Sequence, residues 1–393
     1  MRIAGVIAEY DPFHAGHAWQ LARLRQLGAQ YIVVCMSGPV VQRGTAALFP
    51  VRARAAAALA AGADLVLALP APWAILSAEG FAAGGVAVLS ALGCVDTLAF
   101  GAEHPDADHR AAAAALQSPG FAAALRQVLA GGAPFAAARA AAAEAVLPGA
   151  GALLGCPNDN LGVEYCKAIL RQGSPLTPLA LPRQGAQHGD AAPKTPQAGF
   201  ASAGFLRAEY RRAGLDALAG WVPGEALALY RQAGAAGEML NEAAFGLAVL
   251  ARLRGMDAGQ LARTRGAGEG LDRRLAAALR TAGSLQQLYA GMKTRRYAHA
   301  RLRRLVLDAA LGYTGALPAL PPYLHLLAAR RQALPLCKSA RLPCGCSLAG
   351  LARQSEAAAA VAAAEAAAWD LAALCRQTPG PMGLCYTQKP VLV

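Results

Sequence analysis

Two histidines three residues apart, His14 and His17, are the side chains in this 393-residue chain whose type and spacing most readily do chemistry. They follow an apolar run at 3–8, and Asp11-Pro12 favours a turn before them. Gly16 lets the backbone between them approach a ligand closely. Imidazole N–H groups placed in this way stabilise charge that develops on a phosphate and on a departing pyrophosphate. A helix beginning near His17 would also point free backbone N–H groups at that anion.

The segments around this motif alternate between strand and helix patterns. Apolar runs predict strands at 3–8, 31–36, 64–69, 97–100 and 176–181, and helical spacing predicts helices at 18–27, 51–61 and 161–171. This alternation predicts an α/β fold built on a Rossmann-like, doubly wound parallel sheet. Such sheets bind ligands beyond the carboxyl ends of their strands, which is where both histidines would lie.

The rest of the chain is predicted to be mainly helical. An alanine-rich stretch at 110–147 suits helices, whereas the Gly/Pro-rich stretch at 149–160 and the polar stretch at 183–197 suit loops. Strand signals fade after residue 206, so we expect helices over 216–335 and a long helix at 355–375. The predicted domains are 1–215, an α/β domain, and 216–393, a mainly α-helical C-terminal region.

Composition narrows the class of protein. The hydrophobic fraction of 55% owes much to alanine, and the most apolar stretch, 61–100, holds no unbroken run of about 18–20 apolar residues. We therefore expect neither a membrane span nor a signal peptide. The nine cysteines are scattered along the chain, which is typical of reduced thiols in a cytoplasmic protein. Zinc sites usually combine two pairs of Cys or His ligands, and no second pair accompanies the group Cys337, Cys344 and Cys346. We therefore expect no protein-bound metal. A net charge of +13 favours polyanionic partners.

Several further blocks, taken in order, resemble one known family. They are 9–17 (EYDPFHAGH), 36–44 (MSGPVVQRG), 62–70 (GADLVLALP), 100–103 (FGAE), 157–165 (PNDNLGVEY), 201–207 (ASAGFLR) and 293–304 (KTRRYAHARLRR). The chain resembles the bacterial tRNA(Met) cytidine acetate ligases, a branch of the HxGH nucleotidyltransferase superfamily. The HxGH motif alone marks the superfamily, whereas the blocks at 36–44 and 293–304 are specific to the branch.

The resemblance implies an enzyme that uses ATP, with Mg²⁺, to activate acetate as acetyl-adenylate. The acetyl group then passes to the N4 amine of the wobble cytidine in elongator methionine tRNA. It also implies that 1–215 binds ATP and that 216–393 binds RNA. His14 and His17 would be catalytic, and the ATP site would comprise Ile7, Ala8, Glu9, Tyr10, Asp11, Pro12, Phe13, His14, Ala15, Gly16, His17, Ala18, Trp19, Gln20, Gly101, Asn158, Arg183, Gln184, Ser202 and Arg207.

Individual roles follow from the same resemblance. Gly101 would let adenine or ribose lie against backbone, and the Asn158 block would bind ATP or cap a helix. Ser202 would cap the next helix and Arg207 would neutralise pyrophosphate. Ser37, Gln42 and Arg43 follow the second strand, beside the first motif in a doubly wound sheet, and this position suits contact with the adenylate or the RNA; a surface loop with a local turn is the alternative. The chain departs from the family at Asp159, where a second Asn is usual, at Gly204, usually Thr, and at Val51, often Lys.

A basic block near residue 300 is the candidate RNA contact. Cationic side chains follow a phosphate backbone, and an interspersed ring can stack on a base. A solvated basic helix face is the alternative interpretation. The predicted RNA-binding residues are Lys293, Arg295, Arg296, Arg301, Arg303 and Arg304.

Two other functions use the same residues. A nucleotidyltransferase acting on a small phosphate ester would need the histidines but not the basic, helical C-terminal half. A non-catalytic RNA-binding relative would tolerate the departures at Val51 and Gly204, but it would not need an intact His14, Gly16 and His17.

Overall fold

The architecture comes from a computed structural model that describes residues 2–183 and 199–393. A mixed sheet forms the centre, with strand order β10-β8-β5-β2-β1-β6-β7 and β9 paired with β8. Its strands are β1 (Ile3–Ala8), β2 (Tyr31–Ser37), β5 (Leu65–Leu69), β6 (Thr97–Ala102), β7 (Thr177–Pro182), β8 (Leu324–Ala329), β9 (Cys344–Gly345) and β10 (Val391–Leu392).

The five strands from the N-terminal half are parallel, as predicted for a doubly wound sheet. β1 pairs with β2 and β6, β2 continues to β5, and β6 continues to β7. The chain therefore places β2 and β5 on one side of β1, and then β6 and β7 on the other side. This change of direction opens a crevice at the carboxyl ends of β1 and β6, which is the usual ligand position in such sheets.

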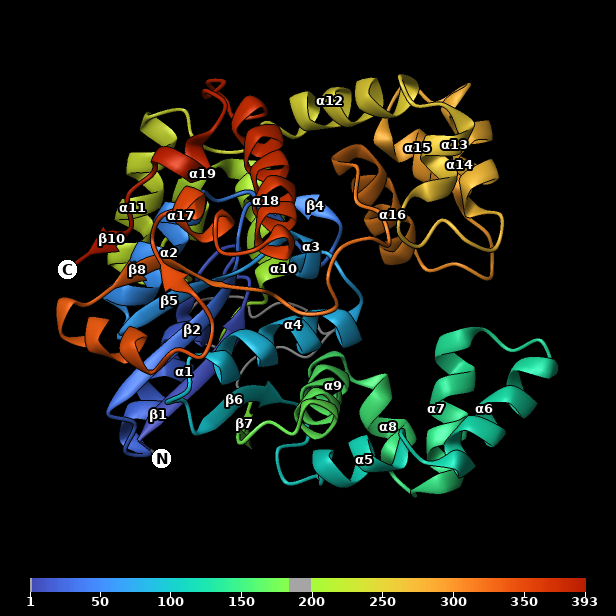
Figure 1. Cartoon of the computed structure of the whole chain (residues 1–393), viewed down its shortest axis with the longest axis horizontal. Helices are drawn as coiled ribbons and strands as arrows, with labels where there is room; N and C mark the ends of the chain where they lie inside the picture. Colours follow the sequence, from blue (N-terminus) through green and yellow to red (C-terminus); the bar gives the residue numbers. More distant parts are fainter. Residues whose placement is uncertain (1, 184–198) are drawn as a thin grey trace.

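Helices cover both faces of this sheet (Figure 1). They are α1 (Ala15–Gln26), α2 (Val51–Ala60), α3 (Ala71–Ala74), α4 (Ala78–Ala91) and α9 (Pro157–Gln172), followed by α10 (Ala203–Ala213) and α11 (Gly224–Ala235). α4 packs against α9, and α2 packs against α11. The buried apolar residues of strands β1, β2 and β5 lie between these layers and form the main core.

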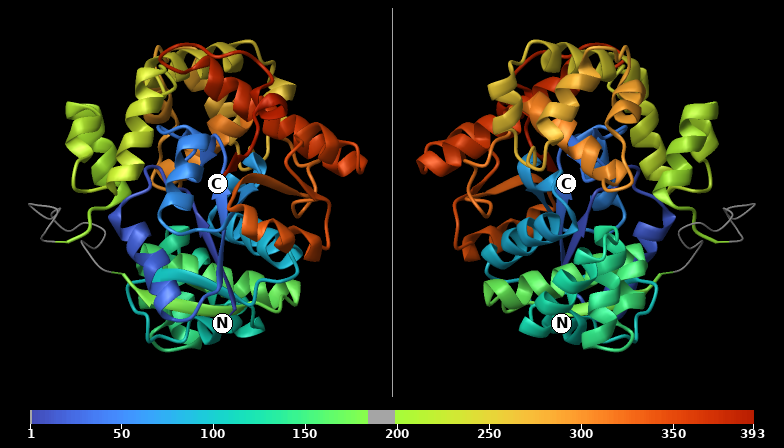
Figure 2. Two further views of the ribbon diagram at one scale, coloured as in Figure 1. Left: turned by 90° about the vertical axis from the view of Figure 1, so that its left-hand side faces the viewer. Right: turned by 90° about the vertical axis from the view of Figure 1, so that its right-hand side faces the viewer.

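Two helical segments project from the sheet on the same side of the molecule (Figures 1 and 2). The first contains α5 (His109–Ala115), α6 (Pro119–Ala130), α7 (Phe135–Val146) and α8 (Ala150–Gly155) and shares a small core with α9. The second contains α12 (Glu242–Arg254), α13 (Ala258–Arg263), α14 (Leu271–Leu279), α15 (Leu285–Met292) and α16 (His299–Leu311). Its larger core also includes buried residues from 40–46, 71–75 and 368–375.

The short hairpin of β3 (Val40–Val41) and β4 (Thr45–Ala46) joins this second segment to the sheet domain. A Cβ atom at Gly44 would lie only 2.5 Å from the backbone nitrogen of Arg304, so the hairpin and α16 are in backbone contact. The remaining elements are the 3₁₀ helices at Leu215–Leu218 and Arg331–Ser339, with α17 (Leu348–Ala352), α18 (Glu356–Leu374) and α19 (Leu384–Thr387).

Helix α18 is the one helix among the described residues that is long and apolar enough to cross a membrane. It packs against α17, α19 and α3, and it buries Val361, Glu365 and Trp369 in the protein. A buried Glu365 that accepts a hydrogen bond from the indole of Trp369 is typical of a core helix rather than of a lipid-facing one.

Four secondary-structure predictions are wrong. Helix α1 begins at Ala15, not 18, because His14 caps it. Gly101 lies inside β6 rather than after it. Most of 149–160 is helical, because Pro157 at the first position of α9 favours a helix start. The segment 216–335 contains β8, which extends the sheet by pairing antiparallel with β5.

Candidate active site

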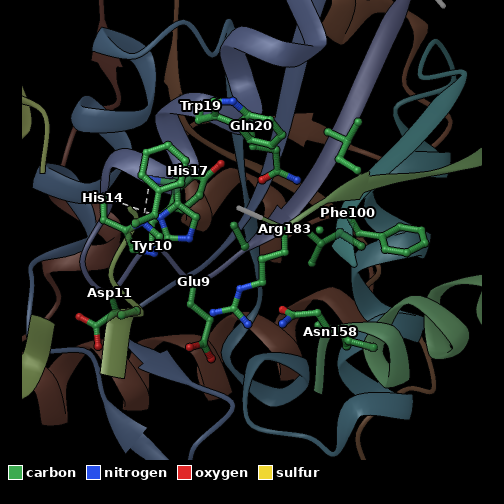
Figure 3. Close-up of a pocket in the computed structure, with 18 of the residues that line it drawn as sticks. Glu9, Tyr10, Asp11, His14, His17, Trp19, Gln20, Phe100, Asn158 and Arg183 are labelled. Atoms are coloured by element: carbon green, nitrogen blue, oxygen red, sulfur yellow. Dashed lines mark hydrogen bonds between the residues drawn. The ribbon is translucent and has the colours of Figure 1, made fainter. Parts of the chain in front are cut away.

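A cavity of about 340 Å³ opens at the carboxyl ends of β1 and β6. His14 and His17 lie on one side of it and Arg183, Phe100 and Asn158 on the other (Figure 3). The cavity therefore occupies the crevice that the strand order creates.

The two histidines form the start of helix α1. His14 is the N-cap, and its Nδ1 accepts the N–H of Gly16 at 3.1 Å, while Nδ1 of His17 accepts the N–H of His14 at 3.2 Å. The rings stack with their centroids 3.7 Å apart. Because both Nδ1 atoms accept hydrogen bonds, the proton of each neutral ring is on Nε2, so each ring has an Nε2–H donor to offer a ligand.

Both imidazoles are neutral at physiological pH. Burial, reinforced by the positive charges of Arg183 and Arg207, lowers the pKa of His14 to about 3. Burial and the neighbouring His14 and Arg183 place the pKa of His17 well below its usual range. These residues therefore act as hydrogen-bond donors rather than as acids that charge and discharge near pH 7.

The prediction that backbone N–H groups of the helix start remain free is wrong. The N–H of Ala15 donates to the carbonyl of Trp221 at 3.0 Å, and the N–H of Gly16 is taken by His14. The imidazoles, not the first-turn amides, are the donors available to an anion at this helix terminus.

Glu103 organises the opposite side of the cavity. Its carboxylate accepts the backbone and side-chain N–H groups of Asn158, at 3.1 and 2.5 Å, and lies 3.4 Å from a guanidinium nitrogen of Arg183. Asn158 is in the first turn of α9 and does not cap it, since Cys156 holds the cap position. No local pattern in the sequence predicts a role for Glu103, although the block at 100–103 contains it.

Gly101 presents bare backbone to the cavity. A Cβ atom at this position would have no neighbour within 4 Å. The space that a side chain would fill is open to a ligand, as the prediction of a base or ribose lying against backbone requires.

The β3–β4 hairpin supplies a third side of the site. Arg43 forms ion pairs with Glu9 and Asp11, both at 2.8 Å, so neither carboxylate repels an anionic ligand at full strength. Gln42 lines the cavity, and its side-chain nitrogen is buried without a hydrogen-bond partner among the described residues, as is the hydroxyl of Tyr10. Buried donors without partners at a cavity wall indicate a polar ligand.

Arg54, which the sequence analysis missed, holds the strand ends together. It is fully buried in α2 and donates to the carbonyls of Glu9, Ser37, Gly38 and Phe49. Its one sequence signal is an arginine within the apolar helix at 51–61. This network fixes the turn that carries Tyr10 and Asp11, which explains why a charged residue is tolerated in the core.

Ser202 and Arg207 lie next to the cavity without lining it. Ser202 caps α10 by accepting the N–H of Phe205 at 3.2 Å, and Arg207 donates to the carbonyl of Asp11 at 2.5 Å. Burial lowers the pKa of Arg207 to about 10. Its guanidinium lines a second cavity of about 180 Å³ together with Arg43, Arg211 and Arg303.

The structure brings most predicted ATP-site residues to one place. Those that line the main cavity are Ile7, Ala8, Glu9, Tyr10, Asp11, His14, Gly16, His17, Trp19, Gln20, Gly101, Asn158 and Arg183. Pro12, Phe13, Ala15 and Ala18 do not line it, and Gln184 is outside the described residues. The apolar part of the lining, Phe81, Phe100, Leu161, Tyr165, Leu181 and Phe200, escaped prediction because hydrophobic spacing does not separate core from cavity wall.

The family departures do not damage this geometry. A Cβ at Gly204 would meet the side chains of Ser202 and Arg207 at an ordinary 3.7 Å, so a larger residue fits there. Val51 is buried at the start of α2 and does not line the main cavity.

The predicted RNA-binding residues surround the N-terminus of α16 but differ in exposure. Lys293, Arg295, Arg296 and Arg303 are exposed, whereas Arg301 and Arg304 are partly buried. The ammonium group of Lys293 donates to the carbonyls of Thr294 and Tyr297. Arg296 and Arg301 flank the ring of Tyr297 and pair with Glu269. Arg273 and Arg274 of α14, which were not among the predicted RNA-binding residues, line an open groove with Arg296.

A parallel doubly wound sheet with paired imidazoles at the helix start after its first strand defines a nucleotidyl transferase of the HIGH type. The model of the HIGH nucleotidyl transferase family matches residues 1–376, and the chain belongs to that family.

Within it, the chain belongs with the tRNA(Met) cytidine acetate ligases. It is 37% identical to the protein of that name from Latilactobacillus sakei over 78% of this chain and 76% of the relative. It is 35% identical to the one from Levilactobacillus brevis over 84% of both. The structure superimposes on Thermotoga maritima TmcAL bound with alpha-thio ATP over the whole of both chains, with a TM-score of 0.89 and 25% identity. The apo form of that protein gives 0.90.

Proposed function

We propose that this ATP-using ligase activates acetate as acetyl-adenylate and acetylates the N4 amine of the wobble cytidine in elongator tRNA(Met). The observation that carries the proposal is the pair of neutral imidazoles with Nε2–H donors available, across a nucleotide-sized cavity from Arg183. The names of the relatives and the alpha-thio ATP bound by the Thermotoga maritima protein support it.

In the first step an acetate oxygen attacks the α-phosphorus of ATP, and the bond from that phosphorus to the bridging oxygen of the β-phosphate breaks. Negative charge grows on the equatorial oxygens and on the leaving pyrophosphate. The imidazole N–H groups of His14 and His17 and the guanidinium of Arg183 are placed to stabilise this charge. Because the donors are already oriented, little reorganisation is needed as charge develops.

In the second step the cytidine N4 attacks the acetyl carbonyl, AMP leaves with the electron pair of the carbon–oxygen bond, and the nitrogen loses a proton. The lone pair of this amine is delocalised into the ring, so a reactive acyl phosphate is the donor it requires. A wall of apolar side chains, including the buried Phe81 and the partly buried Leu161, would limit access of water to the adenylate.

ATP would enter as its Mg²⁺ complex. Glu9 and Asp11 are the carboxylates that line the cavity, and both are paired with Arg43. We therefore propose that triphosphate oxygens and water, rather than these carboxylates, hold most of the coordination sphere.

The RNA would lie over the exposed arginines of the second helical segment, with 216–393 serving as the RNA-binding region and 1–215 as the ATP-binding region of a cytoplasmic enzyme. The backbone contact between Gly44 and α16 links this surface to the hairpin that carries Gln42 into the cavity. RNA bound at α16 would thus have its target base close to the adenylate.

The test is a single incubation of the pure protein with ATP, labelled acetate and bulk tRNA, followed by nuclease digestion. Labelled N4-acetylcytidine, dependent on ATP and confined to methionine tRNA, is the expected product. A matched reaction without RNA should release pyrophosphate only when acetate is present.

Two outcomes would overturn the proposal. Adenylyl or cytidylyl transfer to a small phosphate ester, with no acetylcytidine, would identify a plain nucleotidyltransferase. Retention of tRNA with no acetate-dependent pyrophosphate release would identify a non-catalytic RNA-binding protein.

A further inference from the structure

Three side chains that can bind a transition metal meet beside the main cavity, in a cluster whose sequence spacing gives no sign of a site. His104 follows β6, Cys156 precedes α9, and Asp159 lies in the first turn of α9. A ring nitrogen of His104, the Sγ of Cys156 and a carboxylate oxygen of Asp159 all lie within 4.8 Å of one another. We propose that this cluster binds one zinc-class divalent cation.

The donor set suits such an ion. One thiolate, one imidazole and one carboxylate are ligands that Zn²⁺ accepts in four-coordinate sites, with bonds of about 2.0–2.3 Å. Tetrahedral bonds of that length separate donor atoms by roughly 3.3–3.5 Å. The nitrogen of His104 and the oxygen of Asp159 are now 2.6 Å apart in a hydrogen bond, so an ion that replaced the shared proton would need them to part only slightly.

The second oxygen of Asp159 is held from behind. Oδ1 accepts the backbone N–H of His104 at 3.2 Å and lies 3.0 Å from Nε2 of the buried His109. This leaves Oδ2 directed at His104, which is how outer-shell partners orient a ligating carboxylate. His104 is exposed, so the ion has a path from solvent and room for a water as its fourth ligand.

The ion would tie together two segments that form the edge of the ATP cavity. Glu103 immediately precedes His104, and Asn158 lies between the other two ligands. Glu103 already accepts the backbone N–H groups of Asn158 and Asp159, at 3.1 and 3.0 Å. Metal binding would therefore stabilise the contact of Glu103 with Asn158 and Arg183. The proposal that the cluster binds a metal does not depend on the proposed reaction.

The test is a Co²⁺ titration of the full-length protein, reduced and stripped of metal by a chelator, followed by absorbance. We expect one equivalent of Co²⁺ to bind with thiolate-to-cobalt charge-transfer absorption, and Zn²⁺ to displace it. Cys156→Ser should abolish the charge-transfer absorption. His109→Gln, which removes an outer-shell partner, should weaken binding about 10- to 100-fold in a chelator competition.

Cys346→Ser is the matched control, because Cys346 is exposed and belongs to the other group of neighbouring cysteines. This variant should titrate like the parent protein. The proposal is overturned if the parent shows no thiolate absorption, if the absorption survives Cys156→Ser, or if it disappears in Cys346→Ser. Circular dichroism of each variant separates loss of a ligand from loss of the fold.

Discussion

At the scale of single residues, the site depends on hydrogen-bond direction more than on charge. His14 and His17 each use Nδ1 to accept a backbone N–H of the helix start, which commits Nε2–H as the free donor. The same contacts make the histidines part of the helix cap. The catalytic role that we propose and the stability of the helix start therefore involve the same two rings, and experiments must separate them.

Replacing His17 should abolish adenylate formation without unfolding the protein. His17→Gln is the sharper variant, since Gln at this helix position can still accept the N–H of His14, whereas His17→Ala removes that hydrogen bond as well. Acetate-dependent pyrophosphate release should fall on the order of 10²-fold or more in both. The exposed His299→Ala serves as control and should keep its rate. Near-normal turnover in folded His17→Gln would show that the ring is not a catalytic donor.

The lowered pKa of His14 predicts acid sensitivity. Below about pH 6.5 the unfolded chain takes up a proton on this ring, whereas the folded protein does not until about pH 3, so the free energy of unfolding falls as pH drops through that window. One such proton contributes at most about 1.4 kcal/mol per pH unit, and partial exposure reduces this. Urea unfolding at pH 7.5 and 5.5 should show a smaller acid loss in His14→Asn than in the parent. Equal losses in both proteins would refute this interpretation.

Gly101 offers a way to block the cavity without disturbing the core. Gly101→Val adds methyl groups where a Cβ would have no atom within 4 Å, and valine suits a strand. Thermal unfolding should change little, while ATP binding measured by calorimetry should weaken by about tenfold or more, since valine takes volume from the ligand. Unchanged ATP affinity in the folded variant would mean that the nucleotide does not approach β6.

At the scale of elements, close packing of helices on the sheet sets the geometry of the site. α9 packs on β6, and Gly162 makes that approach possible. A Cβ at Gly162 would overlap the ring of Phe100, which itself lines the cavity. The position of Asn158, one turn earlier on α9, therefore depends on the absence of a side chain at 162.

Gly162→Ala should consequently destabilise the protein by about 1–3 kcal/mol through overpacking. The control is Gly155→Ala in α8, where a Cβ meets nothing within 4 Å and alanine favours the helix. Chemical denaturation of the two variants makes the comparison. If Gly162→Ala is as stable as Gly155→Ala, then α9 has freedom to shift on β6, and the site edge is less rigid than its contacts indicate.

At the scale of the whole molecule, parts far apart in sequence contribute arginines to common cavities. Arg303 of α16 lines the second cavity with Arg43 and Arg207. The groove along α14 brings Arg273 and Arg274 together with Arg296. The strongly positive chain thus concentrates cationic side chains beside the ATP cavity as well as around α16.

Removing exposed arginines should separate the two half-reactions. Arg295→Gln, Arg296→Gln and Arg303→Gln combined should weaken tRNA binding, and the slope of log K against log salt should fall by roughly 0.7–0.9 for each phosphate that is no longer bound. Arg304 is left intact because it is half-buried against the hairpin. Acetate-dependent pyrophosphate release should continue while transfer to tRNA falls.

The matched control neutralises Arg331, Arg341 and Arg353, three exposed arginines in the segment around α17, which lies away from α16 in Figure 1. It lowers the net charge equally and should leave the salt slope nearly unchanged. If both triple variants lose tRNA affinity to a similar extent, the effect comes from the lowered net charge and not from these three arginines. If a folded variant of the basic block loses both half-reactions together, the block is part of the ATP site.

The sequence by itself determined the elements whose signals are local. Buried strands such as Ile3–Ala8 and the cap residue Ser202 follow from apolar runs and short-range hydrogen bonding, and the ordered motifs identified the family. The alternation of strands with helices was enough to predict the doubly wound sheet, because parallel strands are joined by helical crossovers.

Only the tertiary structure decided what depends on contacts across long stretches of chain. β8 joins the sheet from residue 324 because β5 offers it an edge, which no local pattern records. The role of Glu103 and the meeting of His104, Cys156 and Asp159 likewise depend on where other segments fold. Hydrophobic spacing indicates that a face is buried, but not whether that face packs against the core or lines a ligand cavity. Net charge indicates attraction to polyanions, but it does not identify the partner.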